Sequence, residues 1–308
     1  MAAENVRADI SGLPENCIAN VLSLTTPKDA CRLSLVASKF HSAAHFDGVW
    51  ERFVPRDLVS RAANTRDLLA FTSKKDLYFH LCDHDTIIDD GTKSFALEEG
   101  SGKISYMFSA RSLEIAWGND TRYWRWFSFD KSQFNIHLSR FSEAADLCNA
   151  CWLEIRLKIS TKMLSPGTNY AAYLVFILIS NLSQQQPVDA SYELQPVDAS
   201  VRIGEQEGAT RSVYLCSRGI LTTPSFIVSK DQLGVRYGQL CFRPGEHYEA
   251  GGCEYPKIRD DTWMEVELGE IFIRGGVEED EWVDISLKEV TGGLWKDILV
   301  LGIEIRPN

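Results

Sequence analysis

The sequence predicts two parts of different fold class, a small all-α segment at the N-terminus and a mainly antiparallel, jelly-roll-like β-sandwich over most of the remaining chain. Three observations predict this division. Apolar residues recur at helical spacing between residues 13 and 50, and beyond residue 91 the period becomes two. Many short strand-like segments then follow with almost no helical pattern between them, which is typical of a sandwich and not of an α/β fold.

The first helix is expected to start at Pro14 and Glu15, because proline suits the first turn and an acidic residue complements the helix dipole. Ser11 or Gly12 is expected near its N-cap. One apolar stripe follows at positions i, i+3 and i+4, formed by Ile18, Val21 and Leu22.

A second helix is expected from Pro27, with Thr26 as its cap and Asp29 in its first turn. A third, about Lys39 to Phe46, leads to the large apolar anchor Trp50. Because isolated units of about 40 residues or fewer are marginal, these helices are expected to bind a partner.

The same residues resemble the F-box family. The resemblance is carried by Leu13-Pro14, Val21-Leu22, Asp29-Ala30, Leu33-x-x-Val36, Lys39-Phe40 and Trp50. It implies docking on a Skp-type adaptor, and through it on the cullin of a ubiquitin ligase. The implied adaptor-binding residues are Leu13, Pro14, Ile18, Val21, Leu22, Leu33, Val36 and Trp50. The alternative is an ordinary helical hairpin packed on its own protein.

Charge and hydropathy restrict the partners. The net charge of −11, without a Lys/Arg-rich run, argues against nucleic acid and against an anionic membrane surface. Met1–Gly12 lacks the apolar core of a signal peptide, and the apolar run Ala171–Ile179 is far shorter than the ~20 residues of a membrane span. The expected location is the cytoplasm, the nucleus or both.

The eight cysteines are scattered, so reduced thiols are expected, and no cofactor or metal is predicted. Cys148-x-x-Cys151 would need a second close pair to hold zinc, and Cys241 and Cys253 are separated by eleven residues. No Gly-x-Ser-x-Gly, phosphate loop or His-Glu-x-x-His motif occurs, so the chain is not expected to be an enzyme. Paired carboxylates such as Glu265 and Glu267 would also suit glycoside hydrolysis, but on exposed strand positions they are typical of a solvated face.

The predicted organisation is a disordered tail over 1–10, the helical segment over 11–56, a helical connector over 57–92 and the sandwich over 93–308. Trp152–Ser160 alternates most clearly, whereas Tyr170–Ser180 is apolar throughout and is expected to be a central strand. A short helix is expected at Phe141–Leu147. The other expected strands are Ser94–Leu97, Ile104–Ala110, Leu113–Trp117, Trp263–Ile273, Trp282–Lys288 and Leu299–Ile305.

One segment is duplicated, since Gln186–Ser191 recurs as Gln195–Ser200. Insertions of this kind are tolerated best in surface loops, so the stretch from Gln184 to Ser200 is predicted to be an exposed loop.

The second part resembles the phloem protein 2 and tobacco-lectin group of plants. The resemblance is carried by Tyr106-Met107-x-Ser109-Ala110-Arg111, Ile115-x-Trp117-Gly118, Tyr123-Trp124-x-Trp126, Cys151–Ile155, Leu164-Ser165-Pro166-x-Thr168-x-Tyr170, Trp263-x-Glu265-x-Glu267-Leu268-Gly269-Glu270 and Gly302–Pro307. An F-box joined to this module is similar to the plant F-box proteins of the phloem protein 2-B type. Met264, Asp261-Thr262 and the duplication depart from the group's pattern.

A sugar site is expected around Trp117 and Trp124, because pyranose rings stack on aromatic faces while their hydroxyls need polar partners. The resemblance points to the same two tryptophans, seven apart, and to downstream glutamates. The candidate residues are Trp117, Trp124, Asn119, Asp120, Glu265 and Glu267. Any of the tryptophans, Trp126 most of all, could instead belong to the core.

The expected function is substrate recognition for a Skp-cullin-F-box ubiquitin ligase, with a lectin-like domain that binds N-acetylglucosamine or high-mannose N-glycans. Two alternatives remain open at this point. The sandwich could bind protein targets without sugar affinity, or the chain could be a free cytosolic lectin with vestigial helices.

Overall fold

The computed structural model describes residues 12–129, 140–178, 196–204, 208–215, 224–228, 235–239, 253–261, 263–275, 281–293, 295–296 and 298–308. The predicted N-terminal tail, Ser11, the first copy of the duplication and Cys241 lie outside these residues. The chain divides into two compact units, Met1–Asp90 with Phe95–Ser105, and Gly91–Ser94 with Tyr106–Asn308. Strands β2 (Lys93–Leu97) and β3 (Ile104–Ser109) contribute residues to both units.

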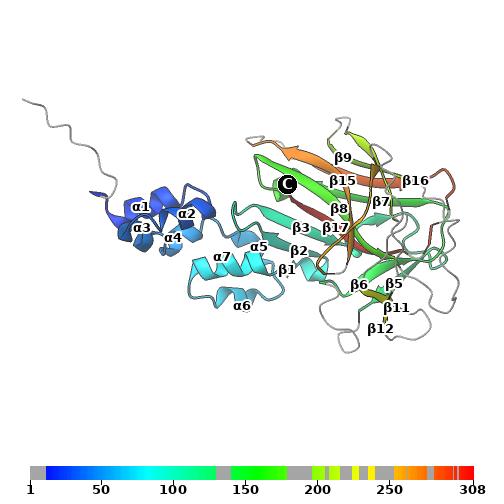
Figure 1. The fold of residues 1–308 in the computed structure, drawn as a ribbon, viewed down its shortest axis with the longest axis horizontal. Helices are drawn as coiled ribbons and strands as arrows, with labels where there is room; N and C mark the ends of the chain where they lie inside the picture. Colours follow the sequence, from blue (N-terminus) through cyan, green and yellow to red (C-terminus); the bar gives the residue numbers. More distant parts are fainter. Residues whose placement is uncertain are drawn as a thin grey trace, which may run out of the picture. The chain divides into compact units, whose positions relative to one another are not determined.

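The first unit is helical, as predicted, and its short helices run in blue to cyan in Figure 1. The helices are α1 (Glu15–Leu22), α2 (Pro27–Leu33), α3 (Ser38–Ala43), α4 (Asp47–Trp50), α5 (Arg56–Ser60), α6 (Thr65–Leu69) and α7 (Lys74–Asp83), followed by strand β1 (Thr86–Ile88).

The helix starts follow local chemistry. The side chain of Thr26 accepts a hydrogen bond from the Asp29 amide at 3.1 Å, which confirms the predicted cap of α2. The N-cap of α1 is Pro14, which makes no side-chain cap hydrogen bond, and Gly12 lies two residues before it. The third predicted helix corresponds to α3, which ends at Ala43, and a separate short helix, α4, begins at Asp47 after the extended Phe46.

The core of this unit is built around Trp50, which is fully buried. Its indole Nε1 donates to the carbonyl of Ala44 at 2.7 Å, and its ring packs on Tyr78 at 5.3 Å and Phe79 at 5.4 Å. Helix α7, part of the predicted connector, therefore covers Trp50, which the sequence analysis predicted to contact the adaptor. Trp50 thus contributes the large apolar area of its ring to the core of the helical unit.

The second unit consists of β-sheets, which confirms the predicted antiparallel architecture; Figure 1 traces them in green to red. In the first sheet, β3 pairs with β17, β17 with β8, β8 with β15 and β15 with β14, while β6 pairs with both β17 and β5. Their bounds are β5 (Trp124–Ser128), β6 (Glu143–Leu147), β8 (Thr168–Leu178), β14 (Lys257–Ile258), β15 (Met264–Ile273) and β17 (Ile298–Pro307).

The second sheet has the order β13-β10-β9-β16-β7-β4 and is antiparallel except for the β10–β13 pair. Its strands are β4 (Glu114–Ile115), β7 (Leu153–Ser160), β9 (Val197–Ile203), β10 (Thr210–Val213), β13 (Cys253–Glu254) and β16 (Trp282–Glu289). A separate pair joins β11 (Pro224–Val228) to β12 (Val235–Gln239).

Alternation along these strands produces the core. Leu153, Ile155, Leu157 and Ile159 of β7 are buried while the residues between them are not, as their spacing predicts. The two sheets approach closely at Gly269 of β15, where a Cβ atom would lie 2.9 Å from a methyl group of Val201 on β9. A glycine is required there because no larger residue fits between the strands.

Two predictions in this unit are wrong. Residues 143–147 form strand β6 and not a helix, because pairing with β17 and β5 supplies their backbone hydrogen bonds. The second copy of the duplication is also not a loop over Val197–Ser200, since this stretch opens β9 and pairs with both β10 and β16. Burial of Val197 and Ala199 against the core overrides the loop-like composition.

Candidate functional site

Three aromatic side chains form an exposed cluster in the second unit. The ring of Trp117 lies 5.0 Å from that of Tyr123 and 5.5 Å from that of Trp152, which meets it edge-on. Trp117 is 46% exposed and Trp152 is 37% exposed. We call Trp117, Tyr123 and Trp152 the aromatic platform; surfaces of this kind bind the apolar faces of ligands.

The platform is held by the tight chain segment between β4 and β5. Asp120 donates its amide to the carbonyl of Trp117 at 2.8 Å, and the amides of Tyr123 and Trp124 both donate to the carbonyl of Asp120 at 3.0 Å. Trp117 itself has a φ of +55°, a conformation that bulky residues rarely adopt. Strained backbone at an exposed aromatic residue is typical of functional sites.

Polar groups border the platform. The Arg122 side chain donates to both carboxylate oxygens of Asp120, from Nε at 3.0 Å and from Nη2 at 2.6 Å, and the Arg122 amide donates to the same carboxylate at 3.0 Å. The guanidinium lies 5.4 Å from the ring of Tyr123. The hydrogen bonds from Arg122 lower the pKa of Asp120, so this carboxylate stays ionised and can accept hydrogen bonds. Asn119 is exposed beside them.

Trp124 does not belong to this surface, contrary to the prediction. It is 2% exposed, and its Nε1 donates to the carbonyl of Ala116 at 3.2 Å. Trp124 is the first residue of β5 and the only buried residue of that strand, so its side chain lies on the interior side. Trp126 is half-buried beneath the guanidinium of Arg111, 3.5 Å from its ring centre.

The two predicted glutamates of β15 are engaged in ion pairs. Glu265 accepts hydrogen bonds from Arg306 at 2.6 Å and from Arg259 at 2.9 Å, and Glu267 accepts one from Arg211 at 2.6 Å. Burial raises the pKa of Glu265, but the hydrogen bonds and charges of the two arginines outweigh burial and leave it below its usual value. These carboxylates therefore act in a charge network within the sheet unit and are not free to bind hydroxyls.

The predicted adaptor-binding residues fall into two groups. Leu13, Pro14, Val21 and Val36 are exposed, and Leu33 is half-buried. Ile18, Leu22 and Trp50 are buried inside the helical unit, so they support the surface and cannot contact a partner directly. The apolar stripe of α1 therefore has two sides: Ile18 and Leu22 face the core, and Val21 faces the solvent.

Two further exposed leucines of the helical unit, Leu24 and Leu35, are not among the predicted adaptor-binding residues. Of the thirteen exposed large apolar side chains in the described residues, six lie between residues 13 and 46. We call this group the helical apolar surface; its members are Leu13, Val21, Leu24, Leu35, Val36 and Phe46.

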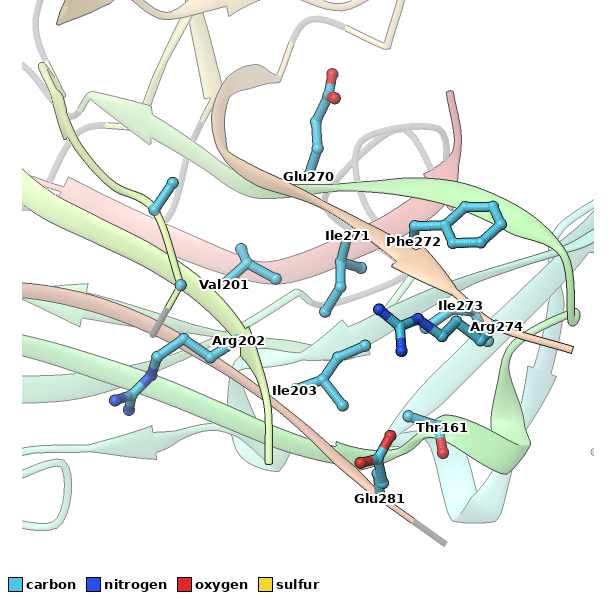
Figure 2. Close-up of a pocket in the computed structure, with 12 residues that line it drawn as sticks. Thr161, Val201, Arg202, Ile203, Glu270, Ile271, Phe272, Ile273, Arg274 and Glu281 are labelled. Carbon is cyan, nitrogen blue, oxygen red and sulfur yellow. The ribbon is translucent and has the colours of Figure 1, made fainter. Parts of the chain in front are cut away.

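A cavity of about 420 Å³ opens between β9 and β15. Figure 2 shows Val201, Ile203 and Ile271 facing one another across it, with the Arg274 guanidinium near the middle. Arg202, Glu270 and Glu281 also line it, so two cations and two anions border the same apolar floor. Because positive and negative side chains are equal in number here, the charge of the cavity lining favours neither an anionic nor a cationic ligand.

Within the described residues, no group of three or more His, Cys, Asp or Glu side chains is placed to hold a metal ion. Cys148 is half-buried and Cys151 exposed, and both are free thiols. None of the helices in the described ranges is long and apolar enough to cross a bilayer.

Comparison with known proteins follows the same division of the chain. Residues 10–52 match the model of the F-box domain, and residues 103–307 match the model of phloem protein 2. The chain belongs to the phloem protein 2 family. It combines a lectin-like phloem protein 2 domain with an F-box, the domain of ubiquitin ligase substrate adaptors, and both are non-catalytic kinds of domain.

Several Arabidopsis thaliana relatives share this organisation. F-box protein PP2-B15 is 39% identical over 304 residues, which cover 96% of this chain and 96% of the relative. Putative F-box protein PP2-B2 is 37% identical over 298 residues, which cover 96% of this chain and 82% of that protein. A solved structure of TmCBM61 in complex with β-1,4-galactotriose matches 65% of this chain and 91% of its own, with 9% identity and a TM-score of 0.27, too low to support an argument.

The phloem protein 2 domain thus presents a candidate site that only partly overlaps the predicted one. Trp117, Asn119 and Asp120 lie on or beside the aromatic platform, whereas Trp124 is buried and Glu265 and Glu267 are ion-paired. Trp152 was missed, although alternation in the following strand places it on the face opposite the buried Leu153.

Proposed function

We propose that this phloem protein 2 chain is the substrate-recognition subunit of a Skp-cullin-F-box ubiquitin ligase and acts in the cytoplasm or the nucleus. The helical unit would dock on a Skp-type adaptor, and the lectin-like domain would bind N-acetylglucosamine-containing or high-mannose N-glycans. The exposed aromatic platform carries the glycan part of this proposal.

Adaptor docking is supported by the helical apolar surface. Leu35 is 85% exposed, and Val36 next to it is 69% exposed, at the turn that follows α2. Exposed apolar side chains gathered on so small a unit are costly in water unless a partner covers them. The match to the F-box model covers the same residues.

The docking proposal can be tested by substitution at this turn. Leu35→Glu with Val36→Glu should abolish co-purification with a Skp-type adaptor, because two charges would be buried at the interface. Leu69→Glu is the matched control, since Leu69 is 62% exposed in α6 of the same unit. Retention of the adaptor by the folded double variant would contradict docking through this surface.

Glycan binding is supported by the chemistry around the platform. The C–H face of a pyranose can stack on the ring of Trp117 or Trp152, while sugar hydroxyls donate to the Asp120 carboxylate and accept from Asn119. Both oxygens of Asp120 already accept hydrogen bonds from Arg122, so sugar hydroxyls would donate to their remaining lone pairs. An uncharged ligand with one apolar face and many hydroxyls fits this combination.

A glycan array with the full chain tests the site. Trp117→Ala and Trp152→Ala should each lower the affinity for the bound glycan by about 1–3 kcal/mol, roughly fivefold to a hundredfold, with an unchanged melting temperature. Trp282→Ala is the matched control, because Trp282 is 47% exposed on β16 and its ring is met by Lys158. Unchanged glycan binding by stably folded Trp117 and Trp152 variants would refute the site.

One observation favours a second candidate function, a domain that binds protein targets without sugar affinity. Glu265 and Glu267, the acidic partners expected for a sugar, are held by arginines. An array without any bound glycan, together with capture of a protein target that depends on Trp117, would favour this function.

A further inference from the structure

The cavity between β9 and β15 belongs to neither of the surfaces described above. Its volume of about 420 Å³ lies within the usual range of ligand pockets. Figure 2 shows β15 on one side of it and β9 on the other. Its lining shares no residue with the aromatic platform or with the helical apolar surface, so its ligand is a separate question from the glycan and the adaptor.

The cavity runs along the edges of both strands. Residues 270–274 line it from β15 and the end of that strand, and residues 201–203 line it from β9. Successive side chains of a strand point to opposite faces, so a cavity over one face would be lined by every second residue. A lining of consecutive residues therefore places this cavity beside the backbone of each strand.

The edge of β15 at the cavity is open in the part of the chain that the structure describes. Residues 266–273 of this strand pair with β8 alone, while β14 pairs only with Met264 and Glu265. No residue of β8 lines the cavity, so the cavity lies along the other edge. Peptide groups at an unpaired edge offer amide hydrogens and carbonyl oxygens to a further strand.

The opposite wall is closed. Residues 201–203 of β9 pair with β16, and on the other edge of β9 the pairing with β10 ends at Ser200. Gly208 covers this edge so closely that a Cβ atom there would lie 2.4 Å from the carbonyl oxygen of Val201. An added strand can therefore pair with β15 and only pack against β9.

The cavity has an apolar floor. Figure 2 shows Val201, Ile203 and Ile271 facing one another across it. Val201 is buried, but Ile203 and Ile271 are only half-buried. An apolar group that covered these side chains would remove their remaining surface from water, which is favourable.

The charges of the lining restrict the ligand further. Arg202 donates to an aspartate of β16 at 3.4 Å, and Glu270 accepts from an asparagine side chain at 2.6 Å, so both are engaged within the sheet unit. The other two charged residues, Arg274 and Glu281, have opposite signs. A ligand without net charge fits this lining, and an extended peptide backbone is such a ligand.

We propose that the cavity binds an extended peptide segment of a target protein, which adds to the open edge of β15 as a further strand and places one apolar side chain against Val201 and Ile271. Main-chain hydrogen bonds to the strand edge would supply affinity, and the apolar floor would select the side chain. The site goes beyond the proposed function, because it requires neither adaptor docking nor glycan binding.

The test selects peptides from a phage-displayed library of random heptapeptides on the full chain, with counter-selection against Ala209→Trp. Ala209 is exposed and lines the cavity, so an indole there should fill the opening and leave the fold intact. The selected peptides, made synthetically, should bind Ala209→Trp and Ile271→Glu at least about tenfold more weakly than the wild type.

Two control variants accompany this measurement. Ile258→Glu is the matched change, because Ile258 is 46% exposed on β14 and lies outside the cavity lining. Trp117→Ala removes a ring of the aromatic platform. Both should bind the peptides within about twofold of the wild type. Failure to select any peptide that distinguishes the wild type from Ala209→Trp would contradict the proposal, whatever the result of the glycan and adaptor assays.

A second measurement tests for strand pairing. Two forms of a selected peptide carry N-methyl groups at the odd or at the even positions. Alternate amides of a strand point to opposite edges, so one form should lose at least about tenfold in affinity and the other about twofold or less. Equal binding of the two forms would overturn the proposal. So would a dimer of the full chain that Ala209→Trp dissociates, because a second copy would then occupy the edge.

Discussion

Trp117 and Trp124 lie seven positions apart, yet the first is a surface residue and the second is a core residue. Trp117 is 46% exposed in a strained backbone conformation, whereas Trp124 is 2% exposed and donates its indole hydrogen to a carbonyl. The turn between them reverses the chain before β5 begins. The sequence predicts both at a sugar site, and burial leaves only Trp117 on the surface.

The first prediction follows from this contrast. Trp124→Ala should lower the free energy of unfolding by about 3–5 kcal/mol, because it removes a buried aromatic side chain and leaves a cavity. Trp117→Ala should change it by less than about 1 kcal/mol. Urea denaturation of both variants measures the difference. Equal stabilities would mean that Trp124 does not serve the core.

The second prediction concerns the Glu265 carboxylate between Arg306 and Arg259. Its pKa in the folded state lies below the ordinary glutamate value of 4.5, so its ion pairs stabilise the fold fully above that pH and progressively less as the pH falls through the folded-state pKa. Glu265→Gln should cost about 2–3 kcal/mol at pH 7, a difference that shrinks as the pH falls below 4.5.

The control for this experiment is Glu114→Gln, because Glu114 is exposed on the edge strand β4. Unfolding free energies of the three proteins between pH 3 and pH 7 provide the comparison. If the gap between wild type and Glu265→Gln stayed constant over this range, the carboxylate would not be shifted by its arginines.

At the scale of elements, strand β9 shows how pairing overrides local composition. Val197–Ser200 belongs to a duplicated, proline-containing polar stretch, yet it pairs on one side with β10 and on the other with β16. Val197 and Ala199 are fully buried. Two neighbouring strands and a core face stabilise a strand more than loop-like residues disfavour it.

The third prediction uses the duplication itself. Deleting residues 186–194 leaves one intact copy in front of Val201, so β9 keeps its sequence and only the connection becomes shorter. The unfolding free energy should change by about 1 kcal/mol or less. Val197→Asp should instead cost at least about 3 kcal/mol, because it buries an unpaired carboxylate in the same strand. Thermal denaturation of both proteins checks this, and a severe loss on deletion would show that residues 186–194 are needed by the fold.

At the scale of the whole molecule, the chain has two compact units, and each candidate surface lies within one of them. The helical apolar surface belongs to residues 13–46, and the aromatic platform belongs to residues 117–152. Because the two surfaces share no residues, a substitution in one should leave binding at the other unchanged.

The fourth prediction states this separation. The Leu35→Glu/Val36→Glu chain should lose the Skp-type adaptor and keep the glycan affinity of the wild type, and Trp117→Ala should do the reverse. Adaptor pull-down and glycan titration of the same two preparations measure it. A Trp117 variant that also lost the adaptor, while still folded, would show that the two units are coupled.

Much of this protein could be predicted from its sequence. Hydrophobic periodicity identified the helical unit, the strands β7, β15, β16 and β17 and the change between two fold classes, because periods of 3.6 and 2 are local properties of the chain. A continuous apolar run identified β8. The Thr26 cap was predicted for the same reason, since a cap depends on residues three positions apart. The motifs of the F-box and of phloem protein 2 were likewise readable without coordinates.

Only the tertiary structure decided which candidate residues face solvent. Helix α7 covers Trp50, arginines from distant strands hold Glu265 and Glu267, and Trp152 joins Trp117 from 35 positions away in the chain. Each of these depends on contacts between segments far apart in sequence, and burial is a property of such contacts. A pattern of residues shows what a side chain can do, and its neighbours in space determine whether it stabilises the fold or binds a partner.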